Sequence, residues 1–173
     1  MKIHARTERL ILRDWSLEDI AAYAAIIADP EVMRYIGNGM PRDRGQAEDF
    51  VRAMMHHQVE RGWMRFAVEH AETGTLLGFS GLDDKNGPLD FGWRLGREFW
   101  GGGFVFEASA AALWVGRNTF GLTKITAQSF PENVGSVRIM EKMGMSLIGQ
   151  REEQGKPVVV FGFPAEWPDG LDE

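Results

Sequence analysis

Three consecutive glycines stand between two segments of different pattern. Gly101, Gly102 and Gly103 follow a strand-like run and precede an alanine-rich, helix-like run. A loop without side chains at the start of a helix leaves backbone N–H groups pointing outward, and the helix macrodipole adds partial positive charge there. Such a helix start attracts anions, so the glycines are candidates for holding a phosphate-bearing ligand. For glycines alone, a flexible connector is the alternative interpretation.

Several other site chemistries lack the residues that they need. The chain has no cysteine, which excludes disulfides, thiolate metal sites and a cysteine nucleophile. Its four histidines show no metal-ligand spacing, and His56 and His57 are adjacent on a predicted helix, so they point in different directions. We therefore expect no metal. The glycine stretch also lacks the Gly-Lys-Ser/Thr of a Walker nucleotide loop.

Length and composition are those of an ordinary globular protein. The 173 residues are 44% hydrophobic and 25% charged, which predicts one domain over residues 1–173. No apolar run approaches the roughly 18 residues of a membrane span, and the N-terminus has no signal-peptide core, so we expect a cytoplasmic protein away from membranes. The net charge of −6 argues against nucleic acid as a partner and mildly favours a cationic one such as an amine.

The period of the apolar pattern predicts the elements that position the glycines. Helical spacing and end signals place helices at 16–28, 44–61, 104–119 and 133–143. Alternation and turn residues place strands at 10–14, 63–69, 75–82, 89–95, 124–129, 145–152 and 157–163. The acidic tail at 168–173 is expected to be mobile. The glycines thus follow the fourth strand and open the third long helix.

This order resembles the GNAT superfamily of acetyl-CoA-dependent N-acetyltransferases, most closely its ribosomal-protein N-terminal acetyltransferase (RimJ/RimL-like) branch. One matching block joins Gly92-Trp-Arg-Leu95 to Trp100-Gly-Gly-Gly-Phe-Val-Phe-Glu-Ala108, and a second runs from Pro131 to Met145. The resemblance covers nearly the whole chain. It implies an α/β (α+β) three-layer fold, in which helices cover both faces of a mixed, mostly antiparallel twisted sheet of about seven strands.

The resemblance also implies acetyl-CoA as cosubstrate and a set of residues that hold it. Backbone N–H groups of the glycine stretch would cradle the pyrophosphate, and backbone groups near Leu95 would pair with the pantetheine arm. The residues so implied are Leu95, Trp100, Gly101, Gly102, Gly103, Phe104, Val105 and Asn133. Val105 stands where the family carries Gly or Ala. Ordinary strand pairing would also explain Leu95, and Asn133 is a good helix N-cap.

Two residues are candidates for proton transfer. By resemblance, Ser136 would protonate the departing thiolate, because the tyrosine that many family members use has no match; Tyr23 and Tyr35 lie in the N-terminal part. Asp90, where the branch often carries Glu, could take a proton from the incoming ammonium, directly or through water. The structural alternatives are a polar residue in a helix's first turn for Ser136 and a strand-edge aspartate for Asp90.

These observations predict an N-acetyltransferase in which the amine attacks the thioester directly in a ternary complex. A protein N-terminal α-amine, with a pKa of about 8, is more often neutral at pH 7 than lysine at about 10.4, so it suits a site with a weak base. One alternative acceptor is a small amine such as an antibiotic, polyamine or amino acid. Another interpretation is a non-catalytic acyl-CoA-binding module. A monomer and a homodimer both stay open.

Overall fold

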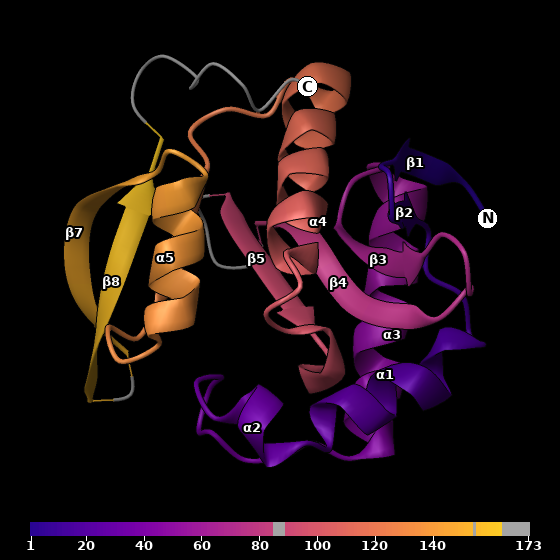
Figure 1. The fold of residues 1–173 in the computed structure, drawn as a ribbon, viewed down its shortest axis with the longest axis horizontal. Coiled ribbons are helices and arrows are strands. Elements are labelled where there is room, and N and C mark those ends of the chain that lie inside the picture. The colour runs from indigo at the N-terminus through magenta and orange to yellow at the C-terminus, as the bar shows by residue number, and fades with distance from the viewer. Residues whose placement is uncertain (85–88, 154, 164–173) are drawn as a thin grey trace.

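Alternating apolar residues build a sheet that runs through the centre of the molecule (Figure 1). The structure is a computed structural model that describes residues 1–84, 89–153 and 155–163. Over these residues the sheet has eight strands in the order β1-β2-β3-β4-β5-β6-β8-β7. The strands are β1 (Ile3–Arg6), β2 (Leu10–Arg13), β3 (Arg65–His70), β4 (Leu76–Asp83), β5 (Asp90–Leu95), β6 (Thr126–Ser129), β7 (Ser146–Glu153) and β8 (Lys156–Gly162).

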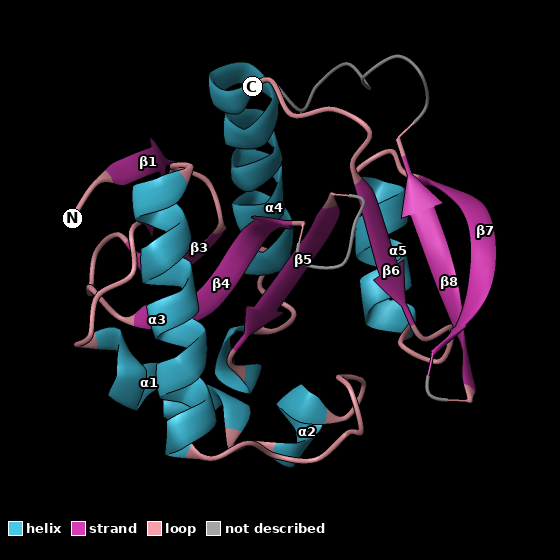
Figure 2. Cartoon of the chain, turned by 180° about the vertical axis from the view of Figure 1, so that it is seen from behind, coloured by secondary structure: helices cyan, strands magenta, loops and turns pink. Residues whose placement is uncertain are grey.

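Helices cover both faces of this sheet. In Figure 1, α4 and α5 lie in front of the strands, and the reverse view in Figure 2 brings α1 and α3 forward. The helices are α1 (Asp19–Ile27), α2 (Pro30–Met33), α3 (Arg44–Glu60), α4 (Phe104–Trp114) and α5 (Val134–Lys142), and a π-helical turn (Val115–Thr119) follows α4. None of the described helices is long and apolar enough to cross a membrane.

The expected three-layer, mostly antiparallel architecture is confirmed, and the described residues form eight strands rather than about seven. The missed strand is β1, which lies at the sheet edge and pairs antiparallel with β2. Its four residues alternate Ile and Ala with His and Arg, too short a pattern to stand out in the sequence. His4 nonetheless fixes it, since its Nε2 lies 2.8 Å from Asp14 Oδ1. The tail at 168–173 lies outside the described residues.

The sheet opens between β5 and β6. Every other pair of neighbours is antiparallel, whereas β5 and β6 run parallel and register at one residue pair in the described chain, Asp90 with Thr126. Beside this pair, Thr126 N donates to Leu89 O at 2.9 Å. Beyond it the two strands separate, so the remainder of β5 presents an unpaired edge.

Core packing fixes both sides of this opening. Below the sheet, the rings of Tyr23, Phe50 and Phe79 stack with centroids 4.7 and 5.2 Å apart, which holds α1 and α3 against β4. Above it, Ala108 and Ala112 are fully buried, and their small side chains let α4 lie close to the strands. Both faces of the sheet on the β4 side of the opening are therefore covered by packed helices.

Candidate active site

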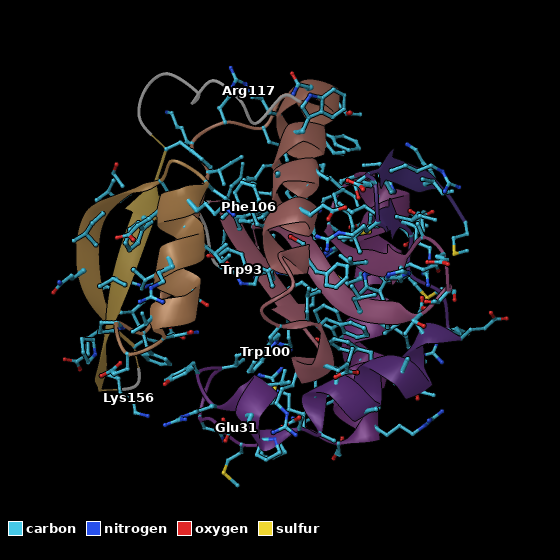
Figure 3. The ribbon with its side chains drawn as sticks, viewed as in Figure 1. Glu31, Trp93, Trp100, Phe106, Arg117 and Lys156 are labelled. Atoms are coloured by element: carbon cyan, nitrogen blue, oxygen red, sulfur yellow. The ribbon has the colours of Figure 1, made fainter. Side chains whose placement is uncertain are left out.

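A cavity of about 630 Å³ lies where the end of β5, the start of α4, the start of α5 and α2 meet. Figure 3 shows the residues around it: Trp93 lies between β5 and α5, Phe106 on α4, Trp100 below them and Glu31 on α2. This volume falls in the range of a site for a small-molecule ligand or cofactor. Its walls combine aromatic rings with backbone groups.

The glycine stretch gives the cavity a helix start with free donors. Gly101 and Gly103 both line it, and their φ values of 76° and 81° belong to the left-handed region that glycine adopts without strain. The first bond of α4 runs from Glu107 N to Gly103 O at 3.1 Å, so the amides of the three preceding residues come before it. A Cβ on Gly101 would meet nothing within 4 Å, so the backbone there faces open space.

The N-terminal segment braces this loop from outside the cavity. Arg9 Nη1 donates to Gly102 O at 2.9 Å, while Arg9 Nε and Thr7 Oγ1 donate to the Glu107 carboxylate at 2.7 and 2.5 Å. Burial opposes ionisation of Glu107, but the hydrogen bonds from Thr7 and Arg9 outweigh it and hold the pKa of Glu107 below its ordinary value. Side chains about a hundred residues away in sequence therefore contact both the loop and the first turn of α4.

The open edge of β5 also faces the cavity. Gly96 N donates to Leu77 O at 2.8 Å, and hydrogen bonding alternates along an antiparallel pair, so the backbone groups of Trp93 and Leu95 turn away from β4. Leu95 O already accepts a hydrogen bond from Trp100 Nε1 at 2.9 Å. Of the two residues, Trp93 is therefore the one whose backbone carbonyl accepts no hydrogen bond from the described part of the chain and stays open to an extended ligand.

The start of α5 contributes the polar side chains of the opposite wall. Asn133 caps the helix, and its Oδ1 accepts a hydrogen bond from Ser136 N at 3.3 Å. Asn133 and Ser136 both line the large cavity, and Ser136 is half-buried. Because the cap uses the backbone amide of Ser136, the hydroxyl of Ser136 is not needed to hold the helix.

Asp90 lies apart from Ser136, in a smaller cavity of about 200 Å³. Its Oδ2 accepts a hydrogen bond from Arg65 Nη2 at 2.9 Å. Burial raises the pKa of Asp90 above its ordinary value, although Arg65 works in the opposite direction. Among the described residues, no group of three His, Cys, Asp or Glu is placed to hold a metal ion.

The two cavities adjoin, because both are lined by the same four described residues: Tyr35, Ile36, Trp93 and Arg94. We call this shared wall the junction. Asp90 approaches it from the side of α1 and α3, and Ser136 from the side of α4 and α5. The structure therefore places the two candidate proton-transfer groups in adjoining cavities, on opposite sides of the junction.

Most of the residues predicted to hold the cosubstrate meet around the large cavity. Its lining includes Leu95, Trp100, Gly101, Gly103, Val105 and Asn133. Two predicted residues are not among the lining. Gly102 turns its carbonyl to Arg9, and the Phe104 ring packs against the Arg9 guanidinium at 4.2 Å. The backbone amide of Phe104 still belongs to the free first turn of α4.

Three residues of this site were missed in the sequence: Tyr35, Arg65 and Arg94. Tyr35 was set aside for its N-terminal position, yet the turn after α2 brings it to the junction. Arg94 follows Asp90 at an even spacing on β5, which puts both on one face of the strand, and this alternation was a readable signal. Arg65 could not be found that way, because it reaches Asp90 from β3, across β4.

Comparison with known proteins agrees with this geometry. A family model described as "Acetyltransferase (GNAT) domain" matches residues 9–146. The uncharacterized N-acetyltransferase p20 of Bacillus licheniformis is 32% identical over 164 residues, covering 91% of this chain and 92% of the relative. A GNAT-family acetyltransferase from Bacillus anthracis superposes with a TM-score of 0.81 at 25% identity, covering 94% of this chain and 98% of the other.

A more distant structure shares the fold alone. The ribosomal L7/L12 α-N-protein acetyltransferase RimL, solved in complex with coenzyme A, has a TM-score of 0.77 at 13% identity, over 93% of this chain and 97% of the other. The match of the family model over most of the chain, together with the p20 relative, is decisive. The chain belongs to the GNAT acetyltransferase family and is an acyltransferase.

Proposed function

We propose that the chain transfers the acetyl group of acetyl-CoA to a primary amine, which attacks the thioester directly. The observation that carries this proposal is the meeting of three groups at one cavity: the free helix start of α4, the open edge of β5 and the hydroxyl-bearing start of α5. The first suits a pyrophosphate and the second an extended amide chain. The third supplies a proton donor.

The residues fit acetyl-CoA at each of these places. Amides at the start of α4 would hold the pyrophosphate, since the left-handed glycines keep side chains out of the space before them. The side chain of Val105, which departs from the Gly or Ala of the family, belongs to α4 and leaves its own amide free. The backbone of Trp93 and Leu95 would pair with the pantetheine arm. When bound, acetyl-CoA supplies the thioester carbonyl that the amine attacks.

The amine and acetyl-CoA would then approach the junction from different cavities. An amine entering the smaller cavity meets Asp90, whose raised pKa makes its carboxylate a better proton acceptor than an ordinary aspartate. On the far side, Ser136 Oγ would donate a proton to the departing sulfur. Direct attack needs no covalent enzyme intermediate, in keeping with a chain that has no cysteine.

A protein N-terminal α-amine is the acceptor that we favour, with a small-molecule amine as the alternative. An α-amine with a pKa of about 8 needs less help from a base than a lysine at about 10.4. RimL, which has the same fold, is described as an α-N-protein acetyltransferase. That likeness supports the proposal only through the fold.

The deciding experiment is a thiol-release assay with acetyl-CoA across three acceptor sets: peptides with free N-termini, aminoglycosides and polyamines. Coenzyme A affinity is measured in parallel by calorimetry. We expect release of the thiol with at least one set. Binding of coenzyme A without acetylation of any amine would overturn the catalytic proposal and leave a module that only binds acyl-CoA.

Variants of Ser136 test the proposed acid. Ser136→Ala keeps the backbone amide that Asn133 caps, so α5 should stay intact while turnover falls by at least roughly 100-fold. Ser136→Thr retains a hydroxyl and should keep most of the activity. Ser146→Ala, on the exposed strand β7, is the matched control. If Ser136→Ala turns over like the control, another group or water is the acid.

A further inference from the structure

Arg94 carries a positive charge at the junction without a carboxylate partner. Its Nη1 donates to Tyr23 Oη at 2.8 Å, and no Asp or Glu of the described chain lies within 4 Å of its guanidinium nitrogens. Its Nε is enclosed and has no hydrogen-bond partner. Of the five N–H donors that an arginine offers, one is therefore used. Burial lowers the pKa of Arg94, so its charge is held partly out of water, and an anion that joined it would stabilise that charge.

The carboxylates that line the two cavities are each already paired with another cation. Asp90 binds Arg65, Glu31 lies 3.7 Å from Arg34, and Glu153 lies 3.4 Å from Arg151. The described walls thus offer no free carboxylate to Arg94. Its neighbour Tyr23 cannot supply the charge, because complete burial raises the pKa of that phenol and keeps it neutral.

A second arginine adds to the positive character of this corner. The guanidinium carbons of Arg65 and Arg94 lie 5.4 and 5.3 Å from the centroid of the same Phe79 ring. The Arg65 guanidinium packs over Gly92, where a Cβ would stand in ordinary van der Waals contact, 3.5 Å from Arg65 Nη2. After Asp90 neutralises one of the two arginines, one positive charge remains.

We propose that the acceptor is an amine that also carries an anionic group, a carboxylate or phosphate, which Arg94 binds at the junction while the amine faces Asp90. This inference rests on the proposed amine acetylation and narrows its acceptor. Arginine binds carboxylate and phosphate through two parallel N–H donors, which suits the unused donors of Arg94. Acceptors with several positive charges, such as polyamines and aminoglycosides, would meet repulsion here. The anion belongs either to a small molecule or to an acidic residue near a peptide N-terminus.

Two matched acceptor trios test the charge preference and separate these sources. The small-molecule trio is 5-aminopentanoate, pentylamine and 1,5-diaminopentane, which share a chain length and end in an anion, a methyl group and a cation. The peptide trio is Ala-Glu-Ala-amide, Ala-Gln-Ala-amide and Ala-Lys-Ala-amide. Thiol release gives kcat/KM, and calorimetric titration into protein saturated with coenzyme A gives affinity. We expect the anionic member of at least one trio to be preferred by roughly 10- to 100-fold.

Variants assign the preference to Arg94. Arg94→Gln removes the charge but can still bond Tyr23, so it should abolish the preference by lowering kcat/KM for the anionic member far more than for the neutral member. Arg97→Gln, which alters a nearby exposed arginine that pairs with Asp29, is the control. Equal kcat/KM and equal affinity within both trios would overturn the inference, as would an equal loss for all members in Arg94→Gln. If no amine turns over, amine acetylation fails, and the titrations alone still decide whether an anion binds at Arg94.

Discussion

The two cavities that meet at the junction differ in the polar groups that they offer to a ligand. The larger one combines aromatic and apolar side chains with two sets of open backbone groups: the free amides at the start of α4 and the unpaired edge of β5. The smaller one is bounded by charged side chains, with Asp90 bound to Arg65 and Arg94 bound to Tyr23. Substitution leaves a backbone donor in place unless the new residue is proline, whereas any substitution of a charged side chain changes its charge or its reach. The backbone wall therefore suits a constant cosubstrate, and the side-chain wall suits an acceptor that differs from one enzyme to another.

Asp90→Asn is expected to give the largest effect that is confined to the smaller cavity, a loss of kcat without a loss of coenzyme A affinity. The amide keeps an oxygen for Arg65 but cannot accept a proton from an ammonium, so kcat should fall by roughly 100- to 10,000-fold. Coenzyme A affinity should stay within about twofold of the wild type, because Asp90 does not line the larger cavity. Turnover and calorimetry measure the two values. A loss in kcat of less than tenfold would instead make water the base.

Gly101→Val is expected to affect the larger cavity instead, through a loss of coenzyme A affinity. Its side chain would enter the space in front of the helix start, and we expect coenzyme A affinity to fall by at least about 100-fold. Gly74→Val is the matched control, since Gly74 has a φ of 70° and equally open surroundings in the β3–β4 turn. Both variants should lose about 1–2 kcal/mol in the free energy of unfolding through backbone strain. Equal coenzyme A affinity in the two variants would remove the glycine stretch from the binding site.

Arg65→Gln tests how the neighbouring arginine sets the pKa of Asp90, the proposed base. Burial raises the pKa of Asp90, and the charge and hydrogen bond of Arg65 lower it, so removing Arg65 should raise this pKa further. The carboxylate is then protonated at a higher pH, and the acid limb of the kcat/KM profile should move up by about one pH unit. The same acceptor is used throughout, so the ionisation of its own amine cancels. An unmoved limb would show that Asp90 is not the base.

The contrast between the two cavities also explains which site residues could be predicted from the sequence. The glycine stretch, Asn133 and Ser136 sit in two contiguous segments, so local pattern located them and the elements around them. Arg65 reaches Asp90 across an intervening strand, and Tyr35 arrives from the turn after α2. Such contacts depend on register and on the path of the chain, which no local pattern encodes. The edge strand β1 was missed for another reason, because four residues carry too little periodicity.

The smallest expected effect is on the free energy of unfolding, and it comes from Glu107, which holds Thr7 and Arg9 behind the glycine stretch. Glu107 has a pKa below its ordinary value of 4.5, so its contribution to stability is present in full above that value and is lost as pH falls through the lowered pKa. Glu107→Gln should therefore lower the free energy of unfolding by about 1 kcal/mol at pH 7, a modest figure because Arg9 is partly open to solvent.

Urea denaturation at a series of pH values measures this difference. The gap between wild type and Glu107→Gln should shrink as the pH is lowered below 4.5. Arg9 keeps its hydrogen bond to Gly102 O in the variant, so coenzyme A affinity should change little. A gap that is constant with pH would mean that packing, not charge, holds Glu107. A large loss of coenzyme A affinity would mean that the backbone region is shaped by remote side chains, which would narrow the contrast between the two cavities.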